Sequence, residues 1–132
     1  MVCYNWIEGG NRQLDLVETD YADIAADERT QQYRPMDGIL KLLHALRDRS
    51  VSTAIVTSGQ DFKADTVFGQ LGLTALVTTR ITADDVQQGK PHPEPYRMAA
   101  QRLGVSPQDC LVFEDALSGV QAAVAAGADC IG

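Results

Sequence analysis

The chain alternates short apolar runs with helix-like segments, and this alternation restricts its fold more than any other feature. Short β-prone runs bounded by polar, Gly or Pro residues occur at 52–57, 76–79, 110–113 and 129–131. Apolar residues at helical spacing occur between and before them, at 37–49, 61–71, 96–103 and 118–126. The pattern predicts an α/β fold, a Rossmann-like three-layer core in which helices cover both faces of a parallel sheet.

The length and the apolar content are those of one globular unit. A chain of 132 residues can bury one real core and is too short for two ordinary domains. Its hydrophobic fraction of 45% is ordinary, and no apolar run is long enough to cross a bilayer. The opening residues, MVCYNWIEGGNR, lack the basic start and apolar stretch of a signal peptide. We therefore expect a cytoplasmic protein.

Charge and cysteine usage exclude several classes of partner. The net charge of −7, without a cluster of Lys and Arg, argues against binding to nucleic acid or to an anionic membrane. Three widely spaced cysteines, Cys3, Cys110 and Cys130, suggest neither a disulfide framework nor a zinc site. The two histidines, His44 and His92, are too far apart in the sequence to suggest a metal cluster.

The first candidate site follows the run at 52–57. In a parallel α/β sheet, ligands bind at the carboxyl ends of the strands. A hydroxyl and free amides at Thr57, Ser58 and Gly59 can hold phosphate oxygens where a small turn opens onto a helix. Alone this signal is weak, because Thr57 also fits as the last residue of a strand and Ser-Gly turns are common.

Lys90 is the second candidate. It lies between Gly89 and Pro91 in a loop that also contains Pro93 and Pro95, which is a rigid mount for a lysine. The structural alternative is a proline-rich entry into the helix that follows.

Two adjacent carboxylates, Glu114 and Asp115, are the third candidate. They stand where an apolar run ends, and two like charges beside a core are costly unless a cation or several hydrogen bonds offset them. A metal ion would turn them into ligands, whereas the structural alternative is that they cap the next helix. Taken together, the hydroxyl, the lysine and the acids supply what phosphoryl transfer with Mg²⁺ requires.

These residues carry a resemblance to a known family. AIVTSG, GKPHPEPY and LVFEDALSGVQAAVAAGA, in this order, resemble the second, third and fourth motifs of the haloacid dehalogenase superfamily, in the branch of β-phosphoglucomutase and the sugar-phosphate and polyol-phosphate phosphatases. The resemblance covers roughly residues 35–132. It implies that Thr57 binds the phosphoryl group, that Lys90 stabilises this group and the nucleophile, and that Asp115 with Glu114 binds Mg²⁺.

One departure from the family is serious. The family's nucleophile belongs to an N-terminal DxDGT motif, and nothing in this chain matches it; the nearest string, DLVET at 15–19, lacks the second Asp. Residues 13–33 instead resemble the end of the family's helical cap. We therefore divide the chain into 1–34, with a cap remnant, and an incomplete core at 35–132, as if it were truncated.

The functional hypothesis follows from both observations. By resemblance the chain is a Mg²⁺-dependent phosphatase or phosphomutase of small phosphorylated sugars or polyols, inactive by itself because it lacks the nucleophile. The alternative is a non-catalytic module that binds phosphate and metal or completes another chain.

The missing motif also predicts something about the sheet. The family's nucleophile strand lies between the strand ending at Thr57 and the strand ending at Phe113, and its loss would leave two unpaired edges. The spare β-prone run at 2–7, VCYNWI, suits a buried strand. We expect either that this run fills the slot or that the edges close by self-association with a second copy.

Overall fold

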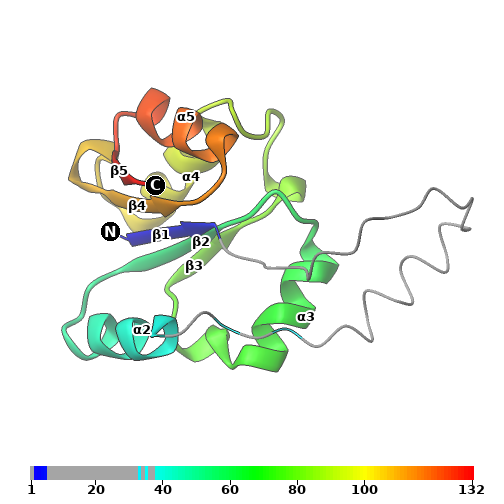
Figure 1. Ribbon diagram of the computed structural model, residues 1–132, viewed down its shortest axis with the longest axis vertical. Coiled ribbons are helices and arrows are strands. Elements are labelled where there is room, and N and C mark those ends of the chain that lie inside the picture. The colour runs from blue at the N-terminus through cyan, green and yellow to red at the C-terminus, as the bar shows by residue number, and fades with distance from the viewer. Residues whose placement is uncertain (1, 6–32, 34, 36–37) are drawn as a thin grey trace, which may run out of the picture.

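The computed structural model describes residues 2–5, 33, 35 and 38–132, and for residues 2–5 only the backbone is considered. The described elements form a parallel sheet between two layers of helices (Figure 1). The strands are β1 (Val2–Asn5), β2 (Thr53–Val56), β3 (Thr79–Ile81), β4 (Leu111–Glu114) and β5 (Asp129–Ile131). The helices are α2 (Ile39–Asp48), α3 (Asp61–Leu71), α4 (Glu94–Leu103) and α5 (Leu117–Ala126). The predicted α/β class is confirmed.

The sheet contains five strands in the order β3-β2-β1-β4-β5, and every pair is parallel. Strand β1 pairs with β2 on one side and with β4 on the other, so that Cys3 lies opposite both Ala54 and Val112. The prediction that the run at 2–7 enters the slot is thus confirmed for Val2–Asn5. Both inner edges are closed within one chain, so a second copy is not needed to close them.

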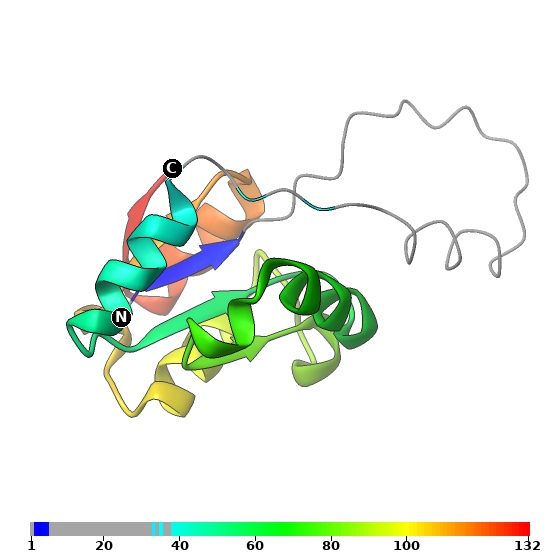
Figure 2. The ribbon, with the colours of Figure 1, turned by 90° about the horizontal axis from the view of Figure 1, so that it is seen from below.

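Alternating side chains divide the core into two layers. Ala54 and Val56 of β2 face the cluster formed with α4 and α5, whereas Ile55 packs against the cluster of α2 and α3. This alternation is what a strand covered on both faces requires. Figure 2 shows α2 and α3 lying against one side of the sheet.

The helices end where the sequence predicts. Gly72 and Gly104 follow α3 and α4 in left-handed conformations, with φ of 65° and 70°, which glycine adopts without a Cβ penalty. Helix α4 begins at Glu94, two residues before the predicted start at Tyr96, because proline is tolerated in the first turn of a helix.

The second predicted strand is displaced along the chain. We expected it at 76–79, but β3 is Thr79–Ile81 and residues Leu73–Ala75 form a 3₁₀ turn. Leu73 and Leu76 bury their side chains beside α2 and α3, which explains their apolar character without a strand. The loop that carries Lys90 begins after Ile81 and includes a second 3₁₀ turn at Ala83–Asp85.

Several expectations concern residues at the margins of the fold. Apart from Tyr33, the cap remnant predicted at 13–33 lies outside the described residues, and the division at 34/35 remains a prediction. The core sheet nevertheless includes residues 2–5.

Burial raises the pKa of the Cys110 and Cys130 thiols, which fits small core residues. His44 is exposed on α2.

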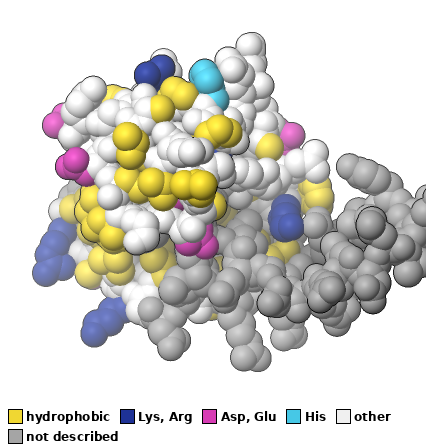
Figure 3. Space-filling model, turned by 45° about the horizontal axis from the view of Figure 1, so that its top comes forward, with side chains coloured by type: hydrophobic (Ala, Val, Ile, Leu, Met, Phe, Trp, Pro, Cys, Tyr) yellow, Lys and Arg dark blue, Asp and Glu magenta, His cyan; other side chains and the backbone are white. Residues whose placement is uncertain are grey.

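Helix α5 carries no charged residue and leaves part of its apolar surface uncovered. Leu117 is 74% exposed and Val124 62% exposed. Figure 3 shows apolar side chains gathered on the side of the molecule that bears this helix.

In the part of the chain that the structure describes, no helix has the length and apolar character that a membrane crossing demands.

Candidate phosphate site

A pocket of about 220 Å³ lies at the carboxyl ends of β2 and β3. Thr57 and Ser58 line it from the end of β2, and Gly89 and Lys90 line it from the loop before α4. The structure thus brings together the first two of the three candidate groups, which are far apart in the sequence.

The turn after β2 uses part of its own hydrogen-bonding capacity. The amide of Thr57 donates to the Ile81 carbonyl at 2.9 Å, and the amide of Gly59 donates to Thr57 Oγ1 at 3.0 Å. At these two positions the expected free amides are therefore engaged. A hydroxyl that accepts a hydrogen bond keeps its own hydrogen, so Thr57 can still donate to a ligand.

The loop that carries Lys90 is held by a carboxylate that sequence reasoning did not single out. Glu94, at the start of α4, accepts hydrogen bonds from the amides of Gln87 at 2.9 Å and Gln88 at 3.0 Å. These bonds fix the polar part of the loop to the helix, in addition to the restriction that the prolines impose on the backbone.

Lys90 and Glu114 form a buried ion pair. Lys90 Nζ lies 2.7 Å from Glu114 Oε2 and 3.1 Å from the carbonyl oxygen of Val56, and the two side chains are 2% and 0% exposed. Glu114 Oε2 also accepts from the Tyr96 hydroxyl at 2.5 Å, and Oε1 accepts from the Ala116 amide at 3.1 Å. The charge of Glu114 is thus balanced by Lys90, and the Tyr96 hydroxyl and the Ala116 amide satisfy its oxygens as neutral donors.

Gly119 makes room for this carboxylate. A Cβ at position 119 would lie 2.0 Å from Glu114 Cδ and Oε2, a distance that real atoms do not tolerate. Only glycine therefore allows the first turn of α5 to pack directly against the buried acid.

The two adjacent acids have different environments. Glu114, the last residue of β4, is buried, whereas Asp115 just beyond the strand is exposed. Asp115 does not line the pocket of Thr57 and Lys90. Within the described residues, no group of three or more His, Cys, Asp or Glu side chains could enclose a metal ion. Asp115 fits the role of one carboxylate ligand to a hydrated Mg²⁺, an ion that usually keeps several waters and takes its other ligands from phosphate.

A polar network joins the end of β3 to the turn after β2. The Ala83 amide donates to the Gly59 carbonyl at 2.9 Å, and the Asp61 amide donates to Asp84 Oδ2 at 2.7 Å. Asp85 accepts from the Thr82 amide at 2.9 Å and pairs with Arg102 at 2.5 Å. Burial works to raise the pKa of Asp85, but the Thr82 and Arg102 contacts outweigh it and lower that pKa.

Replacing Asp85 by asparagine is expected to reduce the free energy of unfolding by about 1 kcal/mol at pH 7. A lowered pKa stabilises the fold above the ordinary value of 3.8, and this contribution disappears as the pH falls through the lower folded value. The difference between the two proteins in urea unfolding should therefore shrink below about pH 4. A difference that is the same at pH 3 and pH 7 would contradict this account.

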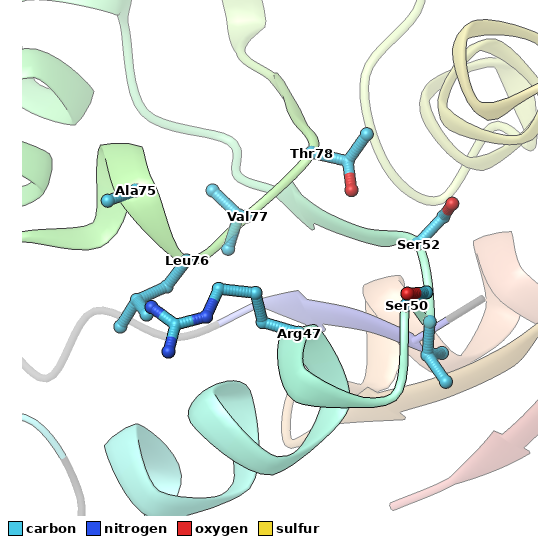
Figure 4. A pocket seen from close by; sticks show the side chains of 8 residues that line it. Arg47, Ser50, Ser52, Ala75, Leu76, Val77 and Thr78 are labelled. Carbon is cyan, nitrogen blue, oxygen red and sulfur yellow. The ribbon is translucent and has the colours of Figure 1, made fainter.

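A second pocket, of about 210 Å³, lies at the opposite, amino ends of β2 and β3. Figure 4 shows Arg47 of α2 beside it, with Ser52 and Thr78 from the segments that lead into the two strands. Arg47 forms an ion pair with its neighbour Asp48 at 2.9 Å. The second pocket contains none of the candidate residues, which all belong to the carboxyl edge.

Comparison with known proteins agrees with the parallel α/β fold. A model of the haloacid dehalogenase-like hydrolase family matches residues 6–127. The chain belongs to this family.

Relatives with named activities are also similar to the chain. Validoxylamine A 7'-phosphate phosphatase of Streptomyces hygroscopicus is 44% identical over 97 residues, which are 74% of this chain and 46% of that protein. Fructose-1-phosphate phosphatase of Escherichia coli is 33% identical over 130 residues, covering 88% of this chain and 67% of that protein. The chain thus spans less than half of the length of the first relative.

A solved relative has the same fold. A family hydrolase from Deinococcus radiodurans, crystallised with bound phosphate and sodium, is 32% identical with a TM-score of 0.73. The superposition covers 83% of this chain and 48% of that one.

Proposed function

We propose that this chain binds the phosphate group of small phosphorylated sugars or polyols at the pocket of Thr57 and Lys90, as the core of a family phosphatase or phosphomutase. The observation that carries the proposal is the pocket itself, which a threonine and a loop lysine both line at the carboxyl ends of two parallel strands. A hydroxyl donor and a fixed positive charge suit phosphate oxygens.

The similar proteins support a small phosphorylated compound as the ligand. Two relatives are named as phosphatases, of fructose 1-phosphate and of validoxylamine A 7'-phosphate, and the solved relative contains bound phosphate.

The proposal includes Mg²⁺, with Asp115 as its carboxylate ligand. When bound, the ion would neutralise negative charge on the phosphate oxygens. The buried Glu114 would act through Lys90, since both of its oxygens already accept hydrogen bonds from the protein.

Strand β1 bears on whether this chain can turn over a substrate. It occupies the place between β2 and β4 where the resembled family carries its nucleophile, and its last residue, Asn5, is in register with Glu114. An asparagine amide cannot replace an attacking carboxylate. We therefore propose binding without hydrolysis for this chain alone.

An NMR titration of the 132-residue chain with inorganic phosphate and Mg²⁺ tests the proposal. We expect shifts at Thr57, Ser58 and Lys90 with phosphate, and Mg²⁺ shifts at Asp115 that grow stronger when phosphate is present. Asp115→Ala should abolish the Mg²⁺ shifts only. The proposal fails if phosphate shifts the NMR resonances of none of the three pocket residues.

Replacing Asn5 by aspartate is expected to raise Mg²⁺ affinity at least about tenfold, because residue 5 ends the strand whose backbone is in register with Glu114, and a carboxylate is a preferred Mg²⁺ ligand. Calorimetric Mg²⁺ titration in the presence of phosphate measures this change. The control is Gln101→Glu, which adds the same charge on the exposed surface of α4. Equal gains in both variants would show that overall charge, not the position of residue 5, is responsible.

A further inference from the structure

Tyr96 is a buried residue behind the site: it ends the GKPHPEPY motif but is not among the residues that line the pocket. It lies in the first turn of α4 and is 1% exposed. Its hydroxyl donates to Glu114 Oε2 at 2.5 Å, and Lys90 Nζ lies 5.0 Å from the centre of its ring. One side chain thus contacts both members of the buried ion pair.

The two contacts have different physical roles. The ring face attracts the ammonium group through its negative quadrupole, and a phenylalanine would do the same. The hydroxyl gives Glu114 Oε2 a second donor besides Lys90, so the carboxylate is held between two elements, the loop before α4 and α4 itself. Hydrogen bonds to a charged group are stronger than neutral ones and restrict its position more tightly.

Glu114 in turn determines where Lys90 lies. The ammonium group is held by Glu114 Oε2 and by the Val56 carbonyl, the last residue of β2 before the Thr57 turn. A rotation of the Glu114 carboxylate would therefore move the positive charge relative to the Thr57 hydroxyl.

We propose that Tyr96 is a positioning residue of the phosphate pocket: its hydroxyl fixes the Glu114 carboxylate, which holds the Lys90 ammonium group beside Thr57. This inference rests on the proposed function, because it assigns Tyr96 to the same phosphate site. The positioning role belongs to the Tyr96 hydroxyl, whereas the Tyr96 ring packs in the core.

Tyr96→Phe tests the proposal, since it removes the hydroxyl and keeps the ring. The Lys90 ¹⁵Nζ and Glu114 ¹³Cδ resonances report the ion pair directly, and inorganic phosphate titration reports the pocket. In Tyr96→Phe we expect both resonances to shift and the dissociation constant for phosphate to rise about tenfold, as for the loss of one hydrogen bond to a charged group.

The chain offers a matched control. Tyr33 is also buried, and its hydroxyl has no hydrogen-bond partner among the residues that the structure describes. Tyr33→Phe should leave both resonances and phosphate affinity unchanged.

The possible outcomes separate the two proposals. Unchanged Lys90 and Glu114 resonances in Tyr96→Phe overturn the positioning role, and so do shifted resonances with unchanged phosphate affinity. If the unmodified chain binds no phosphate, the proposed function fails, and the two resonances alone decide whether Tyr96 positions the ion pair.

Discussion

Replacing Gly119 by alanine is expected to lower the free energy of unfolding by about 3 kcal/mol, because the added methyl group overlaps a buried carboxylate that cannot move aside. The new Cβ would lie 2.0 Å from Glu114 Cδ. Glu114 is tied to Lys90, Tyr96 and Ala116, so relief of the overlap must break at least one of these contacts. Urea unfolding measures the loss, and NMR should show the Lys90 ¹⁵Nζ resonance displaced.

The sign of this prediction opposes the intrinsic preference of a helix. Glycine inside a helix normally destabilises it by about 1 kcal/mol relative to alanine. Gly69 in α3 provides the control, because a Cβ there would meet no atom within 4 Å. We expect Gly69→Ala to stabilise the protein slightly. If Gly119→Ala behaves like Gly69→Ala, the close packing of α5 against Glu114 is wrong.

The sequence predicts the element order because each element has its own periodicity. The β-prone run before Thr57 and the helical spacing of 61–71 need no knowledge of their neighbours, and both are found. The place of β1 follows from a different argument, since unpaired inner edges are costly and only one spare β-prone run exists. The start of β3 could not be predicted in this way, because Leu73 and Leu76 have a strand-like apolar character but pack beside helices.

The candidate site is less accessible to such reasoning. Glu114 and Asp115 look equivalent in the sequence, yet one is buried beside Lys90 and the other is exposed, and only the three-dimensional arrangement separates them. Tyr96 and Gly119 lie within the motifs that suggested the family. Tyr96 is 18 residues from Glu114 and Gly119 is five residues from it, and no local sequence pattern predicts either contact. A tyrosine on the apolar face of the helix at 96–103 is the one available signal, because a buried phenol hydroxyl usually finds a hydrogen-bond partner.

Removing one partner of the Lys90–Glu114 pair is expected to destabilise the fold by about 3 to 5 kcal/mol, because the remaining charge stays buried without its counter-ion. Glu114→Leu leaves the Lys90 ammonium group in an enclosed site, and Lys90→Met leaves the carboxylate there. The double variant Lys90→Met/Glu114→Leu contains neither charge. We expect it to recover most of the lost stability, since replacing a whole buried pair by apolar residues is often neutral.

A double-mutant cycle in urea tests this expectation against an exposed pair in the same protein. Arg47 and Asp48 form an ion pair at 2.9 Å with side chains 47% and 64% exposed, and the coupling between them should not exceed about 1 kcal/mol. Similar coupling energies for the two pairs would show that Lys90 and Glu114 are not buried as described.

In the double variant Lys90→Met/Glu114→Leu we expect the stability to recover and the phosphate binding to be lost. If the ion pair exists mainly to hold the fold together, a stable Lys90→Met/Glu114→Leu protein would bind phosphate as the unmodified chain does. If instead the pair exists to fix a positive charge beside Thr57, the double variant should fold with near-normal stability and show no phosphate shifts at Thr57 and Ser58. Phosphate binding would then explain why the Lys90–Glu114 pair is buried, since buried ion pairs by themselves contribute little net stability.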